Sequence, residues 1–469
     1  MLTKKISRSR ALFLLLMFFI VLGTTFAILN GNQSITQYNY VIILTFAVNM
    51  IIFVYELMVS VYQHPFSLNM MFWLFNLVFL GIAPLLQYMT DIYVWGLDPL
   101  EEEVLKTNIL IFVWTFSYIV GRGIRLTKKN VSRALDVVKP TLSENYKIRT
   151  KWLNLCIIGS VGITGYYLIE VGLSNLIYRQ TSGVSGLSQI ETLITTHGFK
   201  NFLLFTAFFA IIEAKINKKI SVKTIVAVAC LLLGCFPTGL SRNMMASFYV
   251  GLIIILFDKT RKGRWFSIVV FAGLILIFPA MNVFRLVGSE NRNIWDAMIS
   301  AVQNTYLEGH YDAHQMFISV QRYVDSFGFD FFHQIVGALL FFIPRSIWPT
   351  KPVGTGHTVI TELNQYYFTN VSAPLVSELY LACGVVGIVV GGILLAKVLK
   401  KFDRMYWQEK NALTCIRTVY PPVVFMFFFM LRGDMLSSWA YTFAQIAVGM
   451  AMSAVLLEKA DESKAIVKS

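Results

Sequence analysis

Long apolar runs recur along this chain, and they constrain its fold more than any other feature. Each run is close to the roughly 20 residues that a helix needs to cross a hydrocarbon core about 30 Å thick. Of the 469 residues, 56% are hydrophobic and only 14% are charged, and the mean hydropathy is +0.63. A soluble globular domain does not have this composition. The sequence therefore predicts an all-α polytopic membrane protein, folded as a single integral membrane domain over residues 1–469.

About twelve transmembrane helices account best for the apolar runs. We place them near residues 11–29, 40–62, 70–88, 107–121, 152–173, 200–214, 223–238, 243–257, 265–284, 375–396, 413–431 and 438–457. The two runs between 223 and 257 are short, and they form either one broken helix or a re-entrant pair. The N-terminal cations precede an apolar run without a small-residue cleavage site, so we expect an uncleaved first span.

Positive charge is distributed unevenly between the two sides of this arrangement. Thirty of the 40 Lys and Arg residues fall on the side that holds both termini, and ten fall on the other side. Because Lys and Arg gather in cytoplasmic loops, we expect both termini in the cytoplasm and residues 285–374 outside, as a large and partly helical loop. The same rule explains the net charge of +14, so no nucleic-acid partner is expected.

Four cations are predicted to meet on the outer face. Arg345 and Lys351 lie in the proline-rich run at 343–352 (IPRSIWPTKP), while Arg242 and Arg285 lie at the outer ends of predicted spans. Guanidinium groups pair with phosphate oxygens in a bidentate manner, so this arrangement suits a lipid diphosphate. The alternative is that each arginine only extends its charge to the membrane surface from a helix end.

A transfer reaction also needs a base for the attacking hydroxyl group. The candidates are His357, Glu378, Asp312 and Asp434, and structural ion pairs of Arg345 with Glu378 or Arg432 with Asp434 are the alternative. His310 and His314 share a helix face from which Asp312 points away, so no metal site is expected. The aromatic side chains of the outer loop are expected to form an interfacial belt, and some to stack on sugar rings.

The sequence resembles the bacterial O-antigen (oligosaccharide repeat unit) polymerases, the Wzy family. The resemblance is carried by residues 309–312 (GHYD), 343–352, 354–362 (GTGHTVITE), 374–387 (PLVSELYLACGVVG) and 431–434 (LRGD). It covers mainly residues 237–437, while the first six spans are similar only in topology. The run at 343–352 is the most specific of these motifs.

This resemblance implies a metal-independent glycosyltransferase of the lipid-phosphate-sugar type, without a cofactor, in the bacterial inner (plasma) membrane. Its substrates would be oligosaccharides linked to undecaprenyl diphosphate, and the growing chain would move from its carrier onto a new lipid-linked repeat at the outer face. Arg345 and Lys351 would be the main diphosphate ligands, with Arg242, Arg285 and Arg432 in support. His357, Glu378, Asp434 and Asp312 would compete for the catalytic role.

Two other functions fit the same sequence. An O-antigen ligase would use the same donor with a different acceptor, and a lipid-linked oligosaccharide flippase or other transporter would catalyse no transfer. A transporter should show paired halves and polar residues near the middle of the membrane, whereas here the polar residues concentrate in one outer loop. Membrane lipid is an expected partner, and a chain-length-regulating protein is one that the sequence leaves open.

Overall fold

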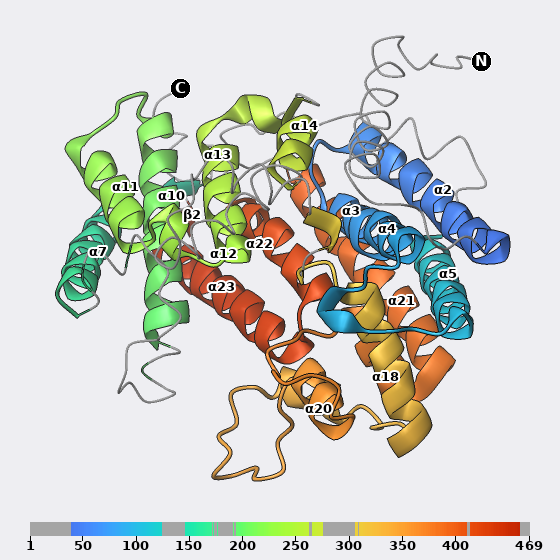
Figure 1. Cartoon of the computed structure of the whole chain (residues 1–469). Helices are drawn as coiled ribbons and strands as arrows, with labels where there is room; N and C mark the ends of the chain where they lie inside the picture. The colour runs from blue at the N-terminus through green and yellow to red at the C-terminus, as the bar shows by residue number, and fades with distance from the viewer. Residues whose placement is uncertain are drawn as a thin grey trace, which may run out of the picture.

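The computed structural model describes residues 39–123, 146–170, 194–261, 265–274, 305–307, 309–409 and 413–459, together with Gly172, Leu176 and Glu191. Helices dominate this part of the chain (Figure 1). Eight helical segments in it are long and apolar enough to cross a membrane: α2 (Tyr40–Gln63), α3 to α4 (Leu68–Thr90), α5 (Glu101–Arg122), α7 (Thr150–Glu170), α11 with η4 (Val222–Gly239), α21 (Leu375–Gln408), α22 (Cys415–Arg432) and α23 (Met435–Leu456). Each of the eight coincides with a predicted span.

The remaining predicted spans are shorter or lie outside the described residues. The helix α10 (Lys200–Ile216) continues a π-helical segment, η3 (Ile194–Phe199), and the apolar segment Arg242–Leu256 comprises α12 (Arg242–Met245), η5 (Ala246–Val250) and α13 (Gly251–Leu256). The predicted pair between 223 and 257 is thus two helices, which separate at Pro237–Gly239. Only α14 (Trp265–Ala272) represents the predicted span at 265–284, and the span at 11–29 lies outside the described residues. Twelve spans therefore remain a prediction.

The long loop predicted between the ninth and tenth spans is partly helical where the structure describes it. Its elements are η8 (Thr305–Leu307), α18 (Ala313–Phe327), α19 (His333–Leu339) and α20 (Thr355–Glu362). Two further short helices are η2 (Val94–Gly96) and η6 (Asp258–Arg261), and α3 (Leu68–Leu77) joins α4 (Ala83–Thr90) through a π-helical turn, η1 (Val78–Ile82). Within the part of the chain that the structure describes, a two-stranded antiparallel sheet pairs β1 (Tyr146–Ile148) with β2 (Leu457–Lys459).

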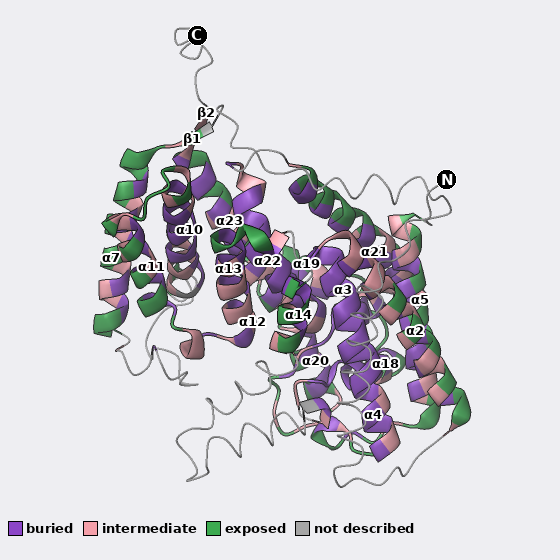
Figure 2. Ribbon diagram, turned by 90° about the horizontal axis from the view of Figure 1, so that it is seen from above, coloured by how far each residue is buried: buried purple, intermediate pink, exposed green. Residues whose placement is uncertain are grey.

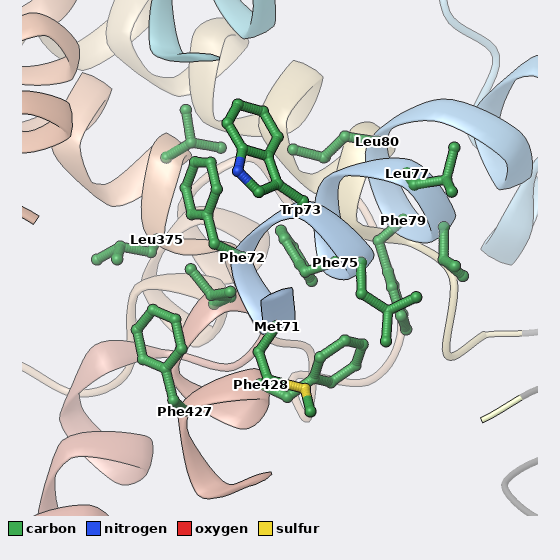
Figure 3. Packing of buried hydrophobic residues seen from close by; sticks show 14 of the residues in the cluster. Met71, Phe72, Trp73, Phe75, Leu77, Phe79, Leu80, Leu375, Phe427 and Phe428 are labelled. Carbon is green, nitrogen blue, oxygen red and sulfur yellow. The ribbon is translucent and has the colours of Figure 1, made fainter. Parts of the chain in front are cut away.

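The helix α3 lies at the centre of the bundle. All ten of its residues are buried. Its two polar side chains make hydrogen bonds within the protein: Asn69 with Ser60 and Tyr118, and Asn76 with the carbonyl oxygen of Phe72. Figure 3 shows Phe72 and Trp73 of this helix beside Leu375 of α21 and Phe427 of α22. The packing of α3 against α22 fixes the position of the helix that carries Arg432.

Outer helices present apolar side chains to the surroundings. Figure 2 shows exposed residues along α2, α5 and α7, whereas α3, α10 and α22 are largely buried. Leu44 and Ile51 of α2 are exposed, and so are Leu155 and Ile158 of α7. Apolar surface of this extent is typical of a face that contacts lipid or another protein, which agrees with an all-α membrane protein.

Glycine allows the closest helix pair to form. A Cβ atom at Gly121 of α5 would lie 2.7 Å from the carbonyl oxygen of Ile393 in α21, and one at Gly392 would lie 3.1 Å from the side chain of Ser117. Within α21, Gly384 has φ +62 and bends the helix. The two ends of α5 make different contacts. At its C-terminal end Arg122 lies near Asp403 of α21, and at its N-terminal end Glu101 accepts a hydrogen bond from Asn39, which precedes α2.

Candidate functional site

A cavity of about 630 Å³ lies where α12 begins and α22 ends. Its charged and titratable lining groups come from three separate parts of the chain: Arg242 of α12, Arg432 of α22, and His310 and Asp312 just before α18. Trp95, Tyr367, Phe368 and Tyr441 contribute aromatic side chains. The structure thus brings together three of the residues predicted for the site, namely Arg242, Arg432 and Asp312.

Arg432 is the last residue of α22, and it anchors the segment before α18. Its Nε donates a hydrogen bond to the carbonyl oxygen of His310 at 2.7 Å, and its Nη2 donates to Oδ1 of Asp312 at 3.1 Å. The indole Nε1 of Trp95 donates to Oδ2 of the same carboxylate at 3.4 Å. Burial raises the pKa of Asp312, and the charge of Arg432 opposes this effect. The outcome is a buried ion pair in the cavity wall.

Arg242 approaches the same segment from the opposite helix. Ser241 caps α12, since its side chain accepts a hydrogen bond from the backbone N–H of Met244. The Nη2 atom of Arg242 lies 2.5 Å from Nε2 of His310. A guanidinium group donates hydrogen bonds and does not accept them, so in this contact Nε2 of His310 is the acceptor. Among the described residues that line it, two arginines and one aspartate give the cavity an excess of positive charge.

Asp434 and Glu378 lie near this region but hold backbone rather than line the cavity. Oδ1 of Asp434 accepts hydrogen bonds from the backbone N–H groups of Ala373, at 2.7 Å, and Gly356, at 3.1 Å. Glu378 accepts from Oγ1 of Thr355 at 2.8 Å and from the backbone N–H of Met435 at 3.1 Å. These contacts join the start of α20 to the starts of α21 and α23. We infer that both carboxylates position the site.

The raised pKa of Asp434 predicts how the stability of the fold depends on pH. Burial raises the pKa of its carboxyl group to about 6 from 3.8, against the opposing effect of its two backbone donors. A carboxyl group whose pKa is higher in the folded protein stabilises the fold in acid, and this contribution is lost as the pH rises through the folded-state pKa. The free energy of unfolding in detergent should therefore fall between about pH 4 and pH 7. Asp434→Asn, which keeps an oxygen acceptor, should flatten this fall, and an unchanged pH profile would contradict the assignment.

Arg345 and Lys351 lie in the proline-rich turn and do not line the cavity. Arg345 is exposed, and its guanidinium donates to the carbonyl oxygens of Lys351 and Pro352 at 2.5 and 3.0 Å. Lys351 Nζ donates to the carbonyl oxygens of Phe341 and Ile343 at 2.5 and 2.9 Å. Both side chains therefore stabilise the turn by donating hydrogen bonds to its own backbone carbonyl oxygens.

The other predicted site residues have different locations. His357 is exposed on α20 and does not line the cavity. Arg285 lies outside the described residues. Where the structure describes ion pairs, Arg432 pairs with Asp312, not with Asp434, and Arg345 contacts loop carbonyls in place of Glu378. Of the predicted site residues that the structure describes, only Arg242, Arg432 and Asp312 line the cavity.

Sequence reasoning missed two contributors to the cavity. His310 belongs to the GHYD motif, but its contact with Arg242 joins positions 68 residues apart and has no signal in the sequence. Trp95 had no signal in the sequence. His314, by contrast, faces the core, where its Nε2 lies 3.1 Å from Oδ1 of Asn108 and burial lowers its pKa to about 3. Across the described ranges, no three His, Cys, Asp or Glu side chains form a group that could hold a metal ion.

The fold and the cavity are those of an all-α protein with helices suited to a membrane and a cationic pocket at the ends of those helices. Comparison of the chain with protein family models, with curated proteins and with solved structures finds no match. A function must therefore be argued from the residues themselves.

Proposed function

We propose that this protein is a polysaccharide repeat-unit polymerase of the bacterial inner membrane. It transfers a growing glycan from undecaprenyl diphosphate onto an oligosaccharide repeat that is itself linked to undecaprenyl diphosphate. The observation that carries the proposal is the cavity in which Arg242 and Arg432 meet His310 and Asp312. Cations beside groups that can accept a proton are what transfer from a lipid diphosphate requires.

The reaction forms one bond and breaks one bond. The hydroxyl oxygen of the acceptor sugar attacks the anomeric carbon of the donor, and the bond from that carbon to the diphosphate oxygen breaks. Undecaprenyl diphosphate leaves with the electron pair, and a base takes the hydroxyl proton. Arg242 and Arg432 offset the charge that develops on the diphosphate. The Asp312 carboxylate is the proton acceptor within the cavity.

The proposal includes an orientation. With twelve spans and both termini in the cytoplasm, the ends of α12 and α22 that form the cavity face outward, where lipid-linked repeats are joined. The distribution of Lys and Arg between the two sides supports this orientation. The apolar surface of the outer helices supplies the contact with membrane lipid.

Deletion of the gene separates this function from its rivals. A polymerase deletion leaves surface glycan with a single repeat, a ligase deletion leaves long chains unattached, and a flippase deletion leaves no repeat outside. The purified protein in liposomes should also convert a lipid-linked repeat into a ladder of longer products, and should do so in EDTA because no metal is required. Absence of a ladder, with long chains unattached in the deletion strain, would establish the ligase instead.

A further inference from the structure

We propose that Trp95, Tyr367 and Phe368 form an aromatic platform that binds one sugar ring of the acceptor glycan beside the cavity cations. The identity of this sugar as the acceptor rests on the proposed polymerase function. The platform itself is argued from backbone conformation, exposure and position. All three residues line the 630 Å³ cavity.

Trp95 has an unusual backbone conformation. It lies in η2 with φ 62 and ψ 15, in the left-handed region that a bulky side chain rarely adopts. The next residue, Gly96, also has a positive φ of 70, but glycine adopts that conformation without penalty. A residue is held in such a conformation only where its surroundings fix it, and these conformations cluster at functional sites.

Three contacts hold the indole ring in place. A Cβ atom on Gly309 would lie only 1.9 Å from Cζ2 of Trp95, so glycine at this position is what lets the ring lie there. The indole Nε1 donates to Asp312 at 3.4 Å, and the ring of Phe368 packs at 66° with its centroid 4.7 Å away. The ring is therefore oriented before any ligand binds.

This platform is accessible to a ligand. Trp95 is 43% exposed and Tyr367 is 98% exposed, whereas Trp73 and Trp114 in the core are fully buried. Phe368 also stacks on Tyr366, with ring centroids 5.5 Å apart and an angle of 8° between the planes. An aromatic residue that served only the membrane interface would be expected to point at lipid. Trp95 instead lines the cavity that contains Arg242 and Arg432.

A sugar ring matches this surface chemically. The C–H groups on one face of a pyranose form an apolar surface that packs on an aromatic ring, while the hydroxyl groups at its edge need hydrogen-bonding partners. Asn370 and Ser372 line the cavity next to the platform and can supply them. Pockets that combine aromatic walls with a few polar groups are the usual form of small-molecule sites. A sugar on this platform lies in the same cavity as the diphosphate.

The test uses the full-length protein in detergent and the oligosaccharide repeat of the host's own surface glycan, released from its lipid by mild acid. Binding is measured by isothermal titration calorimetry. Trp95→Ala should raise the Kd by about 10-fold, and Trp95→Phe, which keeps an aromatic face, by about 3-fold or less. Gly309→Ala keeps the tryptophan but displaces its ring, so it should also weaken binding. Trp152→Ala, which removes an exposed tryptophan on α7, is the matched control and should bind like the wild type.

The outcomes separate this inference from the proposed function. If Trp95→Ala and Gly309→Ala bind the oligosaccharide as tightly as the wild type, the platform is wrong whatever the reaction. If they lose binding while the wild type forms no ladder of products, the platform stands and the polymerase assignment fails. If a folded Trp95→Ala protein shows an unchanged KM for the lipid-linked acceptor in an active enzyme, the acceptor role is wrong.

Discussion

Replacing Arg242 by alanine should slow glycan transfer by about 10²–10³-fold, the usual cost of removing one well-placed donor from developing charge in an active site. Arg242 is buried in the cavity wall, and its guanidinium contacts Nε2 of His310. The substitution removes the donor to His310, so the amount of folded protein is measured together with the rate. The measurement is the rate of ladder formation from a lipid-linked repeat in liposomes, with the amount of folded protein checked by size-exclusion chromatography.

Two variants serve as comparisons for Arg242→Ala. Arg242→Lys keeps the positive charge but lacks the planar fork that pairs with two phosphate oxygens, so its loss should be intermediate. Arg345→Ala removes an arginine whose hydrogen bonds go to carbonyl oxygens of its own turn, so it should slow transfer less than Arg242→Ala does. A wild-type rate for Arg242→Ala, together with a large loss for Arg345→Ala, would show that the diphosphate binds at the proline-rich turn and not in the cavity.

The spans could be predicted from the sequence because apolar length is a local property. Eight predicted segments are apolar helices of sufficient length, but their ends differ from the prediction where charge begins. The helix α5 starts at Glu101, six residues before the predicted span, because Glu103 caps it by accepting from the backbone N–H of Leu100 at 2.8 Å. The helix α21 continues to Gln408, beyond the predicted end at 396. The hydropathy pattern that predicts a span ends where charged residues begin, but the helix itself can continue through them.

The site could be predicted only in part, because its contacts join distant positions. Arg242 and Arg432 could be placed at helix ends from the sequence, but their convergence on the GHYD segment depends on tertiary packing. The donors of Arg345 could equally have faced a substrate, and only the structure shows that they close a turn. Trp95 could not have been found, since its role depends on its backbone conformation and on Gly309, 214 residues away.

The second large effect is expected at the other end of the bundle, where Asp403→Ala should destabilise the fold by roughly 3–5 kcal/mol, as removal of one partner from a buried charge network does. Asp403 accepts hydrogen bonds from the backbone N–H groups of Leu68, at 2.9 Å, and Asn69, at 3.2 Å, which begin α3. It also accepts from the hydroxyl of Tyr420 at 2.5 Å and lies 3.9 Å from Nη1 of Arg122. Its loss leaves the buried N–H of Asn69 and the hydroxyl of Tyr420 without this acceptor, and leaves the N–H of Leu68 with only its longer bond to Tyr420, at 3.3 Å.

Because α3 is the buried centre that packs against α22, this loss should also reduce transfer by displacing Arg432, although Asp403 is far from the cavity in the fold. Unfolding in detergent with increasing SDS measures the stability. Asp403→Asn keeps one oxygen acceptor and should lose less than Asp403→Ala, while Arg404→Ala, at the exposed neighbouring position, should unfold like the wild type. If Asp403→Ala unfolds at the same SDS concentration as Arg404→Ala, the start of α3 does not depend on this carboxylate. The helix would then be held in place by apolar packing alone.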